Sequence, residues 1–351
     1  MKLYKFAALF LVLVMIMTAC TPAATSAPAV QPAAATSAPA GATSAPAAAG
    51  AKWCAGVHLR FFAGGDAGDA FAPIVLRGAK AAEADLGPTV DYVFSGWDTS
   101  KLIAQLGEAI AAKPDGIAYM GHAGDDAVMP LGKKASEAGI KMMYQNVDVP
   151  KVRALYGGGY VGAQLTPQGY ALGQESIRQF SLKSGDHALV LGAWGDPGRF
   201  LREEGTAKAF EDAGLVVTRL KALPAWSADP NSGTGEITAA VLKDPALKIV
   251  VFPGGQLLGA VPTYWDAMKV KPGQIIAVGY DTSPQVIDAF KRGYVMLTSD
   301  QQPYLQGYVP ILSLCMTLKY GMGPMNLDTG AGFVDVSNYQ AVAEQANKGI
   351  R

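Results

Sequence analysis

Short apolar runs alternate with longer amphipathic segments across residues 52–300, and this alternation limits the fold more than any other feature. The runs have the length of buried parallel strands and occupy residues 57–62, 92–94, 116–120, 141–144, 188–191, 249–252, 275–278 and 295–298. The segments between them have a helical period and occupy residues 71–85, 101–112, 128–138, 167–181, 202–213, 236–243 and 284–291. These strand–helix units are more numerous than one open sheet usually holds. The sequence therefore predicts an α/β fold with two doubly wound parallel-sheet lobes.

Local motifs refine this prediction. Thr166-Pro167 and Ser283-Pro284 each place a hydroxyl residue before a proline, which favours helix starts with a side-chain cap.

Residues 157–162 fit the string GxGxxG of dinucleotide-binding proteins. Three residues separate this string from the predicted helix start, and the acid expected about twenty residues later is absent. We therefore interpret residues 157–162 as a flexible segment that crosses between lobes.

The first fifty-one residues predict export rather than folding. Lys2 and Lys5 precede an apolar run at residues 6–17, as in a secretory signal. The sequence Thr18-Ala19-Cys20 resembles the bacterial lipobox, which implies that residues 1–20 are a signal peptide and that Cys20 carries lipid; ordinary cleavage is the alternative. In residues 21–50, 28 of 30 are Ala, Pro, Ser, Thr or Gly, so residues 21–51 are expected to be a disordered tether. The location predicted is extracytoplasmic, periplasmic or at the cell surface, with a lipid anchor in the cell membrane.

Composition excludes several functional classes. Lys plus Arg and Asp plus Glu number 29 each, so no basic field exists for nucleic acid. Three scattered histidines lack zinc-ligand spacing, and the sequence has no nucleophile elbow and no HExxH motif. We expect no metal, no cofactor and no enzymatic activity. His122, Cys54 and Cys315 are interpreted as structural; an oxidising compartment allows a disulfide between the two cysteines, but their spacing does not support one.

Polar and aromatic residues follow nearly every predicted strand, at the edge where open parallel sheets bind ligands. Lys and Arg are almost absent there, and the candidates are Asp69, Phe71, Asn146, Asp148, Glu204, Trp226, Gly255, Gln256, Asp281 and Gln301. Carboxylates and amides bond hydroxyl groups and rings cover apolar CH faces, so the set suits a neutral polyol. Alternatives stay open for single members: a helix cap for Asp69, a helix-dipole partner for Glu204, a core residue for Trp226, and an Asx turn at Asn146 and Asp148.

Four strings within residues 57–338 are distinctive in combination: Pro114-Asp115-Gly116-Ile117, Gly279-Tyr280-Asp281-Thr282-Ser283-Pro284, Asp300-Gln301-Gln302-Pro303-Tyr304 and Gly332-Phe333-Val334-Asp335. They carry a resemblance to the ribose- and galactose-type sugar-binding proteins of bacterial ABC importers, the type I periplasmic binding proteins. It implies two lobes joined by three crossing segments, an N-terminal lobe of residues 52–160 plus 302–331 and a C-terminal lobe of residues 161–301 plus 332–351. It also implies a monosaccharide ligand, a permease partner and a monomer, and the family's ligand contacts fall on the candidates above, with Asp148 close by.

Departures from the family pattern bear on the ligand. The ribose-type pattern has arginines where this chain has Val147 and Glu203-Glu204, and a second aromatic where Ala72 stands. These differences favour a hexose such as glucose over ribose, while a cyclic polyol, a nucleoside or a small furanose signal stays open. A receptor that signals to a membrane sensor kinase is the alternative function, and an extracytoplasmic enzyme acting on sugars is the third.

Overall fold

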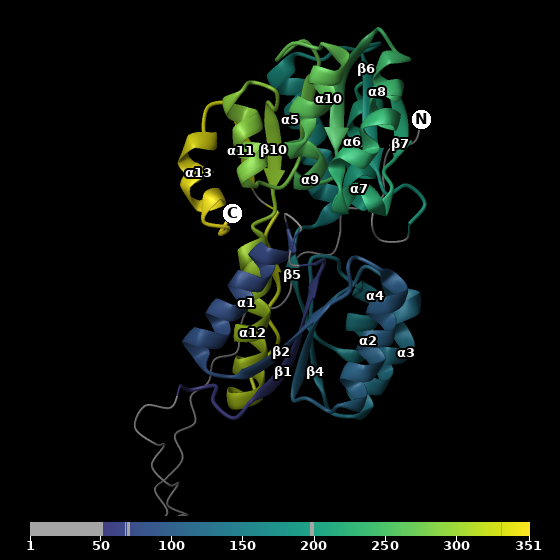
Figure 1. Ribbon diagram of the computed structural model, residues 1–351. Coiled ribbons are helices and arrows are strands. Elements are labelled where there is room, and N and C mark those ends of the chain that lie inside the picture. Colours follow the sequence, from purple (N-terminus) through teal and green to yellow (C-terminus); the bar gives the residue numbers. More distant parts are fainter. Residues whose placement is uncertain (1–51, 67, 69–70, 197–199, 331) are drawn as a thin grey trace, which may run out of the picture. The chain divides into compact units, whose positions relative to one another are not determined.

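The computed structural model describes residues 52–66, 68, 71–196, 200–330 and 332–351, so Cys20, the predicted tether and Asp69 lie outside the described residues. The described residues form two six-stranded sheets (Figure 1). Their strand orders are β2-β1-β3-β4-β5-β11 and β7-β6-β8-β9-β10-β12, which are the same order repeated. All pairs are parallel except β10 with β12. The predicted α/β fold with two doubly wound sheets is confirmed.

The N-terminal lobe surrounds the first sheet. Helices α1 and α12 cover one face of the sheet, and α2, α3 and α4 cover the other (Figure 1). Apolar side chains from both faces make two cores, one on each side of strands β1 and β3. The elements are β1 His58–Gly64, α1 Ala72–Leu86, β2 Thr89–Phe94, α2 Thr99–Ala111, β3 Gly116–Met120, α3 Gly124–Glu137, β4 Lys141–Gln145, α4 Pro150–Tyr156, β5 Gly159–Gly162, α12 Pro303–Tyr320 and β11 Leu327–Asp328.

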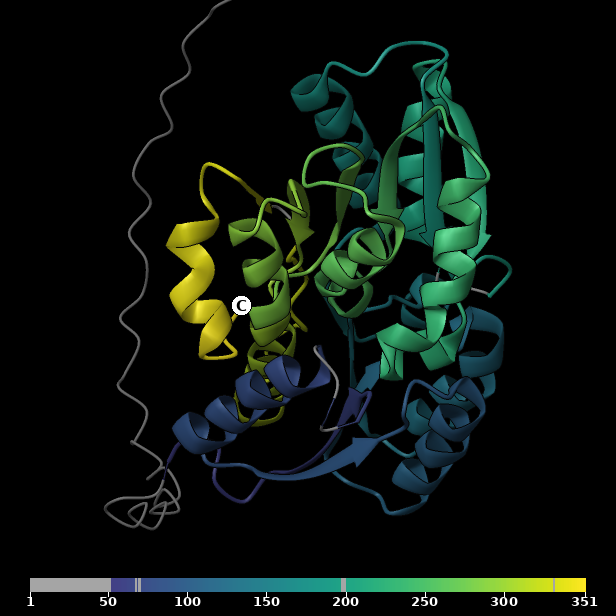
Figure 2. The same ribbon diagram turned by 45° about the horizontal axis from the view of Figure 1, so that its top comes forward.

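The C-terminal lobe repeats this plan around the second sheet. Helices α5 and α6 pack over one core, and the helices from α7 to α11 pack over the other. Helix α13 lies beside α11, where the rings of Tyr339 and Phe290 stack at 5.6 Å (Figure 2). The elements are α5 Leu165–Phe180, β6 His187–Gly192, α6 Leu201–Asp212, β7 Val216–Lys221, α7 Pro224–Ala228, a short 3-10 helix Pro230–Gly233, α8 Thr234–Leu242, β8 Leu247–Phe252, α9 Gly255–Gly259, α10 Val261–Met268, β9 Ile276–Tyr280, α11 Pro284–Lys291, β10 Leu297–Asp300, β12 Gly332–Asp335 and α13 Tyr339–Asn347.

The chain passes between the two sheets three times. The passages follow β5, β10 and β11, at residues 163–164, residues 301–302 and just beyond Thr329. The interpretation of residues 157–162 as a flexible crossing is wrong, because Gly159–Gly162 is strand β5, buried between β4 and β11. Glycine is required at position 159, where a Cβ atom would collide with the carbonyl oxygen of Met325. The lobe boundary drawn between residues 160 and 161 therefore falls inside a strand of the first sheet.

The two predicted helix caps had different outcomes. The Ser283 hydroxyl accepts a hydrogen bond from the backbone N–H of Val286 at 3.2 Å, so this cap is confirmed. The Thr166 cap is wrong, because α5 begins at Leu165, two residues before the predicted helix start at Pro167, and has no side-chain cap. The backbone N–H of Gln164 donates to the Asp328 carboxylate at 3.2 Å, which holds the chain at the crossing, and the helix starts directly after it.

The sequence pattern predicted neither helix α12 nor a disulfide. Helix α12 is apolar on most faces because it lies between α1 and the sheet, so it lacks the one-sided pattern of a surface helix. Its Cys315 forms a disulfide with Cys54, with 5.7 Å between the Cα atoms and a sequence separation of 261. The bridge ties the segment before β1 to α12. In the described part of the chain, no helix has both the length and the apolarity to cross a membrane.

Candidate ligand-binding site

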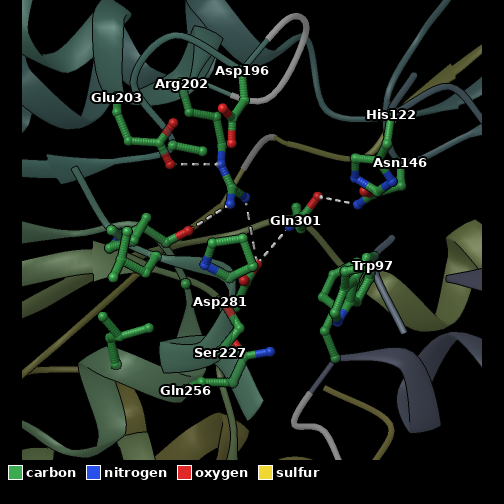
Figure 3. A pocket seen from close by; sticks show the side chains of 18 residues that line it. Trp97, His122, Asn146, Asp196, Arg202, Glu203, Ser227, Gln256, Asp281 and Gln301 are labelled. Carbon is green, nitrogen blue, oxygen red and sulfur yellow. Dashed lines mark hydrogen bonds and ion pairs between the residues drawn. The ribbon is translucent and has the colours of Figure 1, made fainter. Parts of the chain in front are cut away.

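Both lobes line one polar cavity of about 100 Å³ at the carboxyl ends of their strands, where open parallel sheets bind ligands. Figure 3 shows Trp97, His122 and Asn146 on one side and Arg202, Glu203 and Asp281 on the other. Gln301, in the second crossing, lies between them. The side chains that the figure labels are Trp97, His122, Asn146, Asp196, Arg202, Glu203, Ser227, Gln256, Asp281 and Gln301.

A hydrogen-bonded bridge of three side chains joins the lobes across the cavity. The amide of Gln301 donates to the Asp281 carboxylate at 2.6 Å and accepts from the Asn146 amide at 3.3 Å. Gln306 of α12 bonds both amides and thereby fixes their orientation. Because the bridge contains a carboxylate acceptor and two amides, it offers both donors and acceptors to a ligand.

Asn146 and Asp281 occupy equivalent positions in the two lobes. Each directly follows the fourth strand of its sheet, and each backbone N–H donates to the fifth strand, at 3.2 Å to Val161 and 2.9 Å to Ser299. Both have left-handed backbone angles, with φ of 62° and 70°. Asn and Asp adopt this conformation more readily than other non-glycine residues, which explains why the two lobes use these residue types here.

The C-terminal lobe gives the cavity its charges. The Arg202 guanidinium lies 3.8 Å from the Asp281 carboxylate and 3.7 Å from that of Glu203, and it donates to the Pro253 carbonyl at 2.7 Å. Burial lowers the pKa of Arg202, but the two carboxylates more than offset it, so the cation is retained. Burial also raises the pKa of Asp281, against the opposing effects of Arg202 and the Gln301 hydrogen bond. The guanidinium is thus paired with two carboxylates within the cavity and does not by itself favour an anionic ligand.

The N-terminal lobe contributes rings. Trp97 follows β2 and lies with its ring centroid 6.0 Å from that of Phe71 and 5.3 Å from that of His122, edge-on to the imidazole. Residue 64 must be glycine here, because its φ is 88° and a Cβ would lie 2.7 Å from the Trp97 ring. A tryptophan ring held at a cavity wall can cover the apolar CH face of a ligand.

Half of the residues that the sequence analysis proposed line the cavity. They are Phe71, Asn146, Gln256, Asp281 and Gln301. Their side chains follow β1, β4, β8, β9 and β10, so the strand-end argument brought together residues that are up to 230 positions apart. The assignment of ligand contacts to them stays a proposal.

The other described candidates lie elsewhere. Asp148 forms two hydrogen bonds with Arg153, both 2.7 Å, and Glu204 pairs with Arg219 at 3.5 Å. The Trp226 side chain is only 3% exposed and packs in the core of the C-terminal lobe, the alternative raised for it from the sequence.

Gly255 does not line the cavity but bonds Asp281 through its backbone. It supports the acid rather than facing a ligand. Asp69 lies outside the described residues.

Several cavity residues were missed, although a signal existed for some. Trp97 and His122 follow strands β2 and β3, so the strand-end rule would have found both; His122, taken as structural, lines the cavity. Arg202 and Glu203 directly precede the proposed Glu204. Arg202, directly before Glu203-Glu204, therefore places an arginine in the cavity.

The remaining missed residues with polar side chains are Asp196 and Ser227. Asp196 lies in the loop after β6 and pairs with Lys221 at 3.0 Å. Ser227 is on the short helix α7 beside Trp226, where helical phase decides which residue faces the cavity. The described residues contain no group of three or more His, Cys, Asp or Glu side chains able to hold a metal ion.

Two lobes of one topology, three crossings and a shared polar cavity define the class of two-lobed solute-binding proteins. The family model for the periplasmic binding protein domain matches residues 61–321. The chain belongs to this family.

Similar proteins agree with this assignment. The chain is 30% identical over 260 residues to the xylose/arabinose-binding protein XylF of Sulfolobus acidocaldarius, covering 69% of this chain and 62% of that protein, which is less than two thirds of its length. A carbohydrate transporter structure from Acidothermus cellulolyticus 11B in complex with myo-inositol has a TM-score of 0.72 and 26% identity, covering 84% of this chain and 99% of the other. A solute-binding protein of an ABC transporter from Agrobacterium vitis with bound D-fucose has a TM-score of 0.73 at 17% identity, with the same coverage, and shows the fold alone. These relatives are binding or transport proteins, not enzymes.

Proposed function

We propose that this protein captures a monosaccharide between its two lobes outside the cytoplasm and delivers it to the permease of an ABC transporter. The observation that carries the proposal is one cavity containing the Asn146–Gln301–Asp281 bridge, the Arg202 cation and the Trp97 ring. The proposal includes a lipid anchor at Cys20 that keeps the domain near the membrane. The sugar ligands named for the relatives support the ligand class.

The chemistry of the cavity matches a sugar. Asp281 and Glu203 accept hydrogen bonds from hydroxyl groups, Arg202 donates them, and the amides of Asn146 and Gln301 do both. A cavity of about 100 Å³ is smaller than the roughly 300–1,000 Å³ of sites for drug-sized ligands. One sugar ring is therefore the ligand size that we propose, rather than an oligosaccharide.

Fewer departures from the ribose-type pattern bear on the identity of the sugar than the sequence alone indicated. Arg202 places an arginine in the cavity although Glu203-Glu204 provide none. Trp97 provides a second aromatic ring beside Phe71, a ring that Ala72 cannot provide. Val147 remains a departure. We keep a hexose such as glucose as the proposed ligand, and the pentoses xylose and arabinose are its direct competitors in the test.

Capture depends on movement of the lobes about the crossings. Ligand bound to one lobe gains its remaining hydrogen bonds when the other lobe closes, which shifts the population toward the closed form. Micromolar affinity requires about 8 kcal/mol. Several charge-assisted hydrogen bonds and one covered ring face supply this after ordering costs. The closed surface is the form that the permease would recognise.

The test is calorimetric titration of residues 48–351, which form one compact unit, with glucose, xylose, arabinose, myo-inositol, fucose, a nucleoside and an amino acid. We expect one or two monosaccharides to bind with micromolar affinity and to be recovered unchanged. Binding of only the nucleoside or the amino acid would overturn the ligand class. Conversion of the sugar would overturn the assignment as a binding protein.

Two adjacent glutamates provide a matched control. Glu203 lines the cavity, whereas Glu204 points to Arg219, and both are on the first turn of α6. Glu203→Gln should weaken sugar binding at least tenfold, and Glu204→Gln should leave it unchanged. Delivery of the sugar to the permease is tested in cells. Cells that carry only the Glu203→Gln variant of this protein should fail to grow on the sugar at low concentration.

A further inference from the structure

We infer that Tyr280 is a positioning residue for Arg202: its ring and hydroxyl group fix where the guanidinium stands in the cavity. The inference rests on the proposed function, because it assigns Arg202 a ligand contact. Tyr280 ends strand β9, is fully buried and does not line the cavity. Any effect of its hydroxyl group on binding must therefore pass through a neighbour.

Tyr280 contacts Arg202 in two places. The Arg202 guanidinium carbon lies 4.4 Å from the centre of the Tyr280 ring, so the ring supports the cation from one side. The Tyr280 hydroxyl group donates to the Arg202 backbone carbonyl at 3.1 Å. Both the side chain and the backbone of Arg202 are thus held by one tyrosine, while the Pro253 carbonyl accepts from the guanidinium on another side.

A buried threonine connects this contact to helix α5. The hydroxyl oxygens of Thr206 and Tyr280 lie 2.5 Å apart, and the Thr206 hydroxyl group donates to the Gly169 carbonyl at 2.8 Å. Glycine at position 169 lets α5 approach closely, because a Cβ there would collide with the Arg202 carbonyl oxygen. The first turn of α6, which carries Arg202, is therefore pinned against α5, the helix that begins directly after the first crossing.

The two hydroxyl groups share two protons among several acceptors. The Thr206 hydroxyl group lies 2.8 Å from the Gly169 carbonyl oxygen and 3.3 Å from the Arg202 carbonyl oxygen, and the Tyr280 hydroxyl group lies 3.1 Å from the Arg202 carbonyl oxygen; either hydroxyl group can donate to the other. Burial, then the charge of Glu203, raises the pKa of Tyr280, so it stays a donor at neutral pH. Removing the Tyr280 hydroxyl group leaves Thr206 able to bond Gly169, so Tyr280→Phe retains the helix contact and the ring. The Arg202 carbonyl then keeps only the longer side-chain contact, at 3.3 Å to the Thr206 hydroxyl group.

The first experiment is calorimetric titration of residues 48–351 with glucose, the proposed ligand, or with xylose or arabinose where the wild type binds one of these more tightly. Tyr280→Phe should weaken binding about fivefold to tenfold, the loss of one hydrogen bond that orients a ligand contact. Tyr264→Phe is the matched control, because Tyr264 is also fully buried in this lobe and donates to the Pro230 carbonyl at 2.9 Å, outside the cavity. Its affinity should equal that of the wild type. Equal affinity of Tyr280→Phe and wild type would overturn the inference.

A double-mutant cycle separates positioning from general structural damage. Arg202→Met removes the guanidinium, so adding Tyr280→Phe to it should cause no further loss of affinity if tyrosine acts through Arg202. A full additional fivefold to tenfold loss in the Arg202→Met background would overturn the assignment. Thr206→Val should weaken binding as Tyr280→Phe does, and Thr206→Ser, which keeps the hydroxyl group, should restore it; this pair carries the test if Tyr280→Phe does not fold.

A ligand-free measurement keeps this inference distinct from the proposed function. The Nε–H resonance of Arg202, assigned by its absence in Arg202→Met, reports the place of the guanidinium over the Tyr280 ring. The chemical shift of this resonance should move toward that of exposed arginines in Tyr280→Phe and should stay unchanged in Tyr264→Phe. An unmoved resonance in Tyr280→Phe overturns the positioning role, whereas failure of the wild type to bind sugar overturns only the proposed function.

Discussion

The two lobes share one strand order but contribute different chemistry to the cavity between them. The N-terminal lobe supplies rings and an amide, from Phe71, Trp97, His122 and Asn146. The C-terminal lobe supplies charge, from Asp196, Arg202, Glu203 and Asp281. The repeated topology thus fixes where functional side chains stand, after the strands, while the residues at those places decide what each half of the site can bind.

The pair Asn146 and Asp281 shows this difference at single-residue scale. Both have the same left-handed backbone and the same hydrogen bond to the next strand, and both meet at Gln301. One is neutral and the other carries an acid whose pKa burial raises. Four predictions test how far the two lobes differ in what they contribute to ligand binding and to stability.

The largest effect concerns the tryptophans of the two lobes. Trp226→Ala in the C-terminal lobe should lower the free energy of unfolding by about 3–5 kcal/mol, because its ring fills a core. Trp97→Ala in the N-terminal lobe should instead weaken sugar binding roughly tenfold, through loss of a covered CH face, with a smaller change in stability. Urea unfolding and calorimetric titration of both variants measure this; a wild-type unfolding curve for Trp226→Ala would contradict its place in the core.

The disulfide is the second difference, and it belongs to the N-terminal lobe. Replacing Cys54 and Cys315 by serine should lower the free energy of unfolding by about 2–4 kcal/mol, because the unfolded chain regains the freedom of a long closed loop. Sugar affinity should not change, since neither cysteine lines the cavity. Urea unfolding of the double variant, beside wild type with and without reductant, tests this, and an altered affinity would connect the bridge to the site.

The third prediction compares the equivalent residues directly. Asp281→Asn should weaken sugar binding by about 1.5–3 kcal/mol, because charge-assisted hydrogen bonds become neutral ones. Asn146→Gly, which permits the left-handed backbone and removes the amide, should cost about 1 kcal/mol. Titration calorimetry at one pH ranks the two. A larger loss at Asn146 would mean that the uncharged half of the site dominates recognition.

The smallest effect is the pH dependence of binding. Because burial raises the pKa of Asp281, this acid takes up its proton at a higher pH than an exposed aspartate with a pKa of about 4. The protonated form is a poorer acceptor, so affinity should fall a few-fold as pH decreases from 7 into the acidic range, and the fall should begin at a higher pH than an exposed aspartate would give. Arg202 stays charged over this range, and Asp196, Glu203, Asp300 and His122 are the other titratable groups nearby.

The measurement for this prediction is affinity rather than thermal stability. A raised pKa in the folded state means that the folded chain holds this proton more tightly than the unfolded chain, so the contribution of Asp281 to stability is lost as pH rises between the two pKa values. Stability and binding therefore respond to pH in opposite directions. The profile of Asp281→Asn should be flatter than that of wild type, and parallel profiles would assign the effect to another group.

The sequence determined the class of fold and much of the site. Apolar runs of strand length separated by amphipathic segments require parallel sheets covered by helices, because each apolar face has to be buried. Polar residues after those runs then meet at one edge of each sheet, which is why Asn146, Asp281 and Gln301 could be placed together without a structure. The cap at Ser283 was equally local, since it needs only a hydroxyl group before the first turn.

Tertiary structure decided what local pattern leaves open. Successive residues of a helix point about 100° apart, so only the packing of α6 against α5 sets Arg202 and Glu203 toward the cavity and Glu204 toward Arg219. The glycines of β5 indicate flexibility locally, yet neighbouring strands bury that segment. Cys54 and Cys315 pair because the chain returns through the second crossing into α12, which brings Cys315 beside the segment before β1, a path that sequence spacing does not contain.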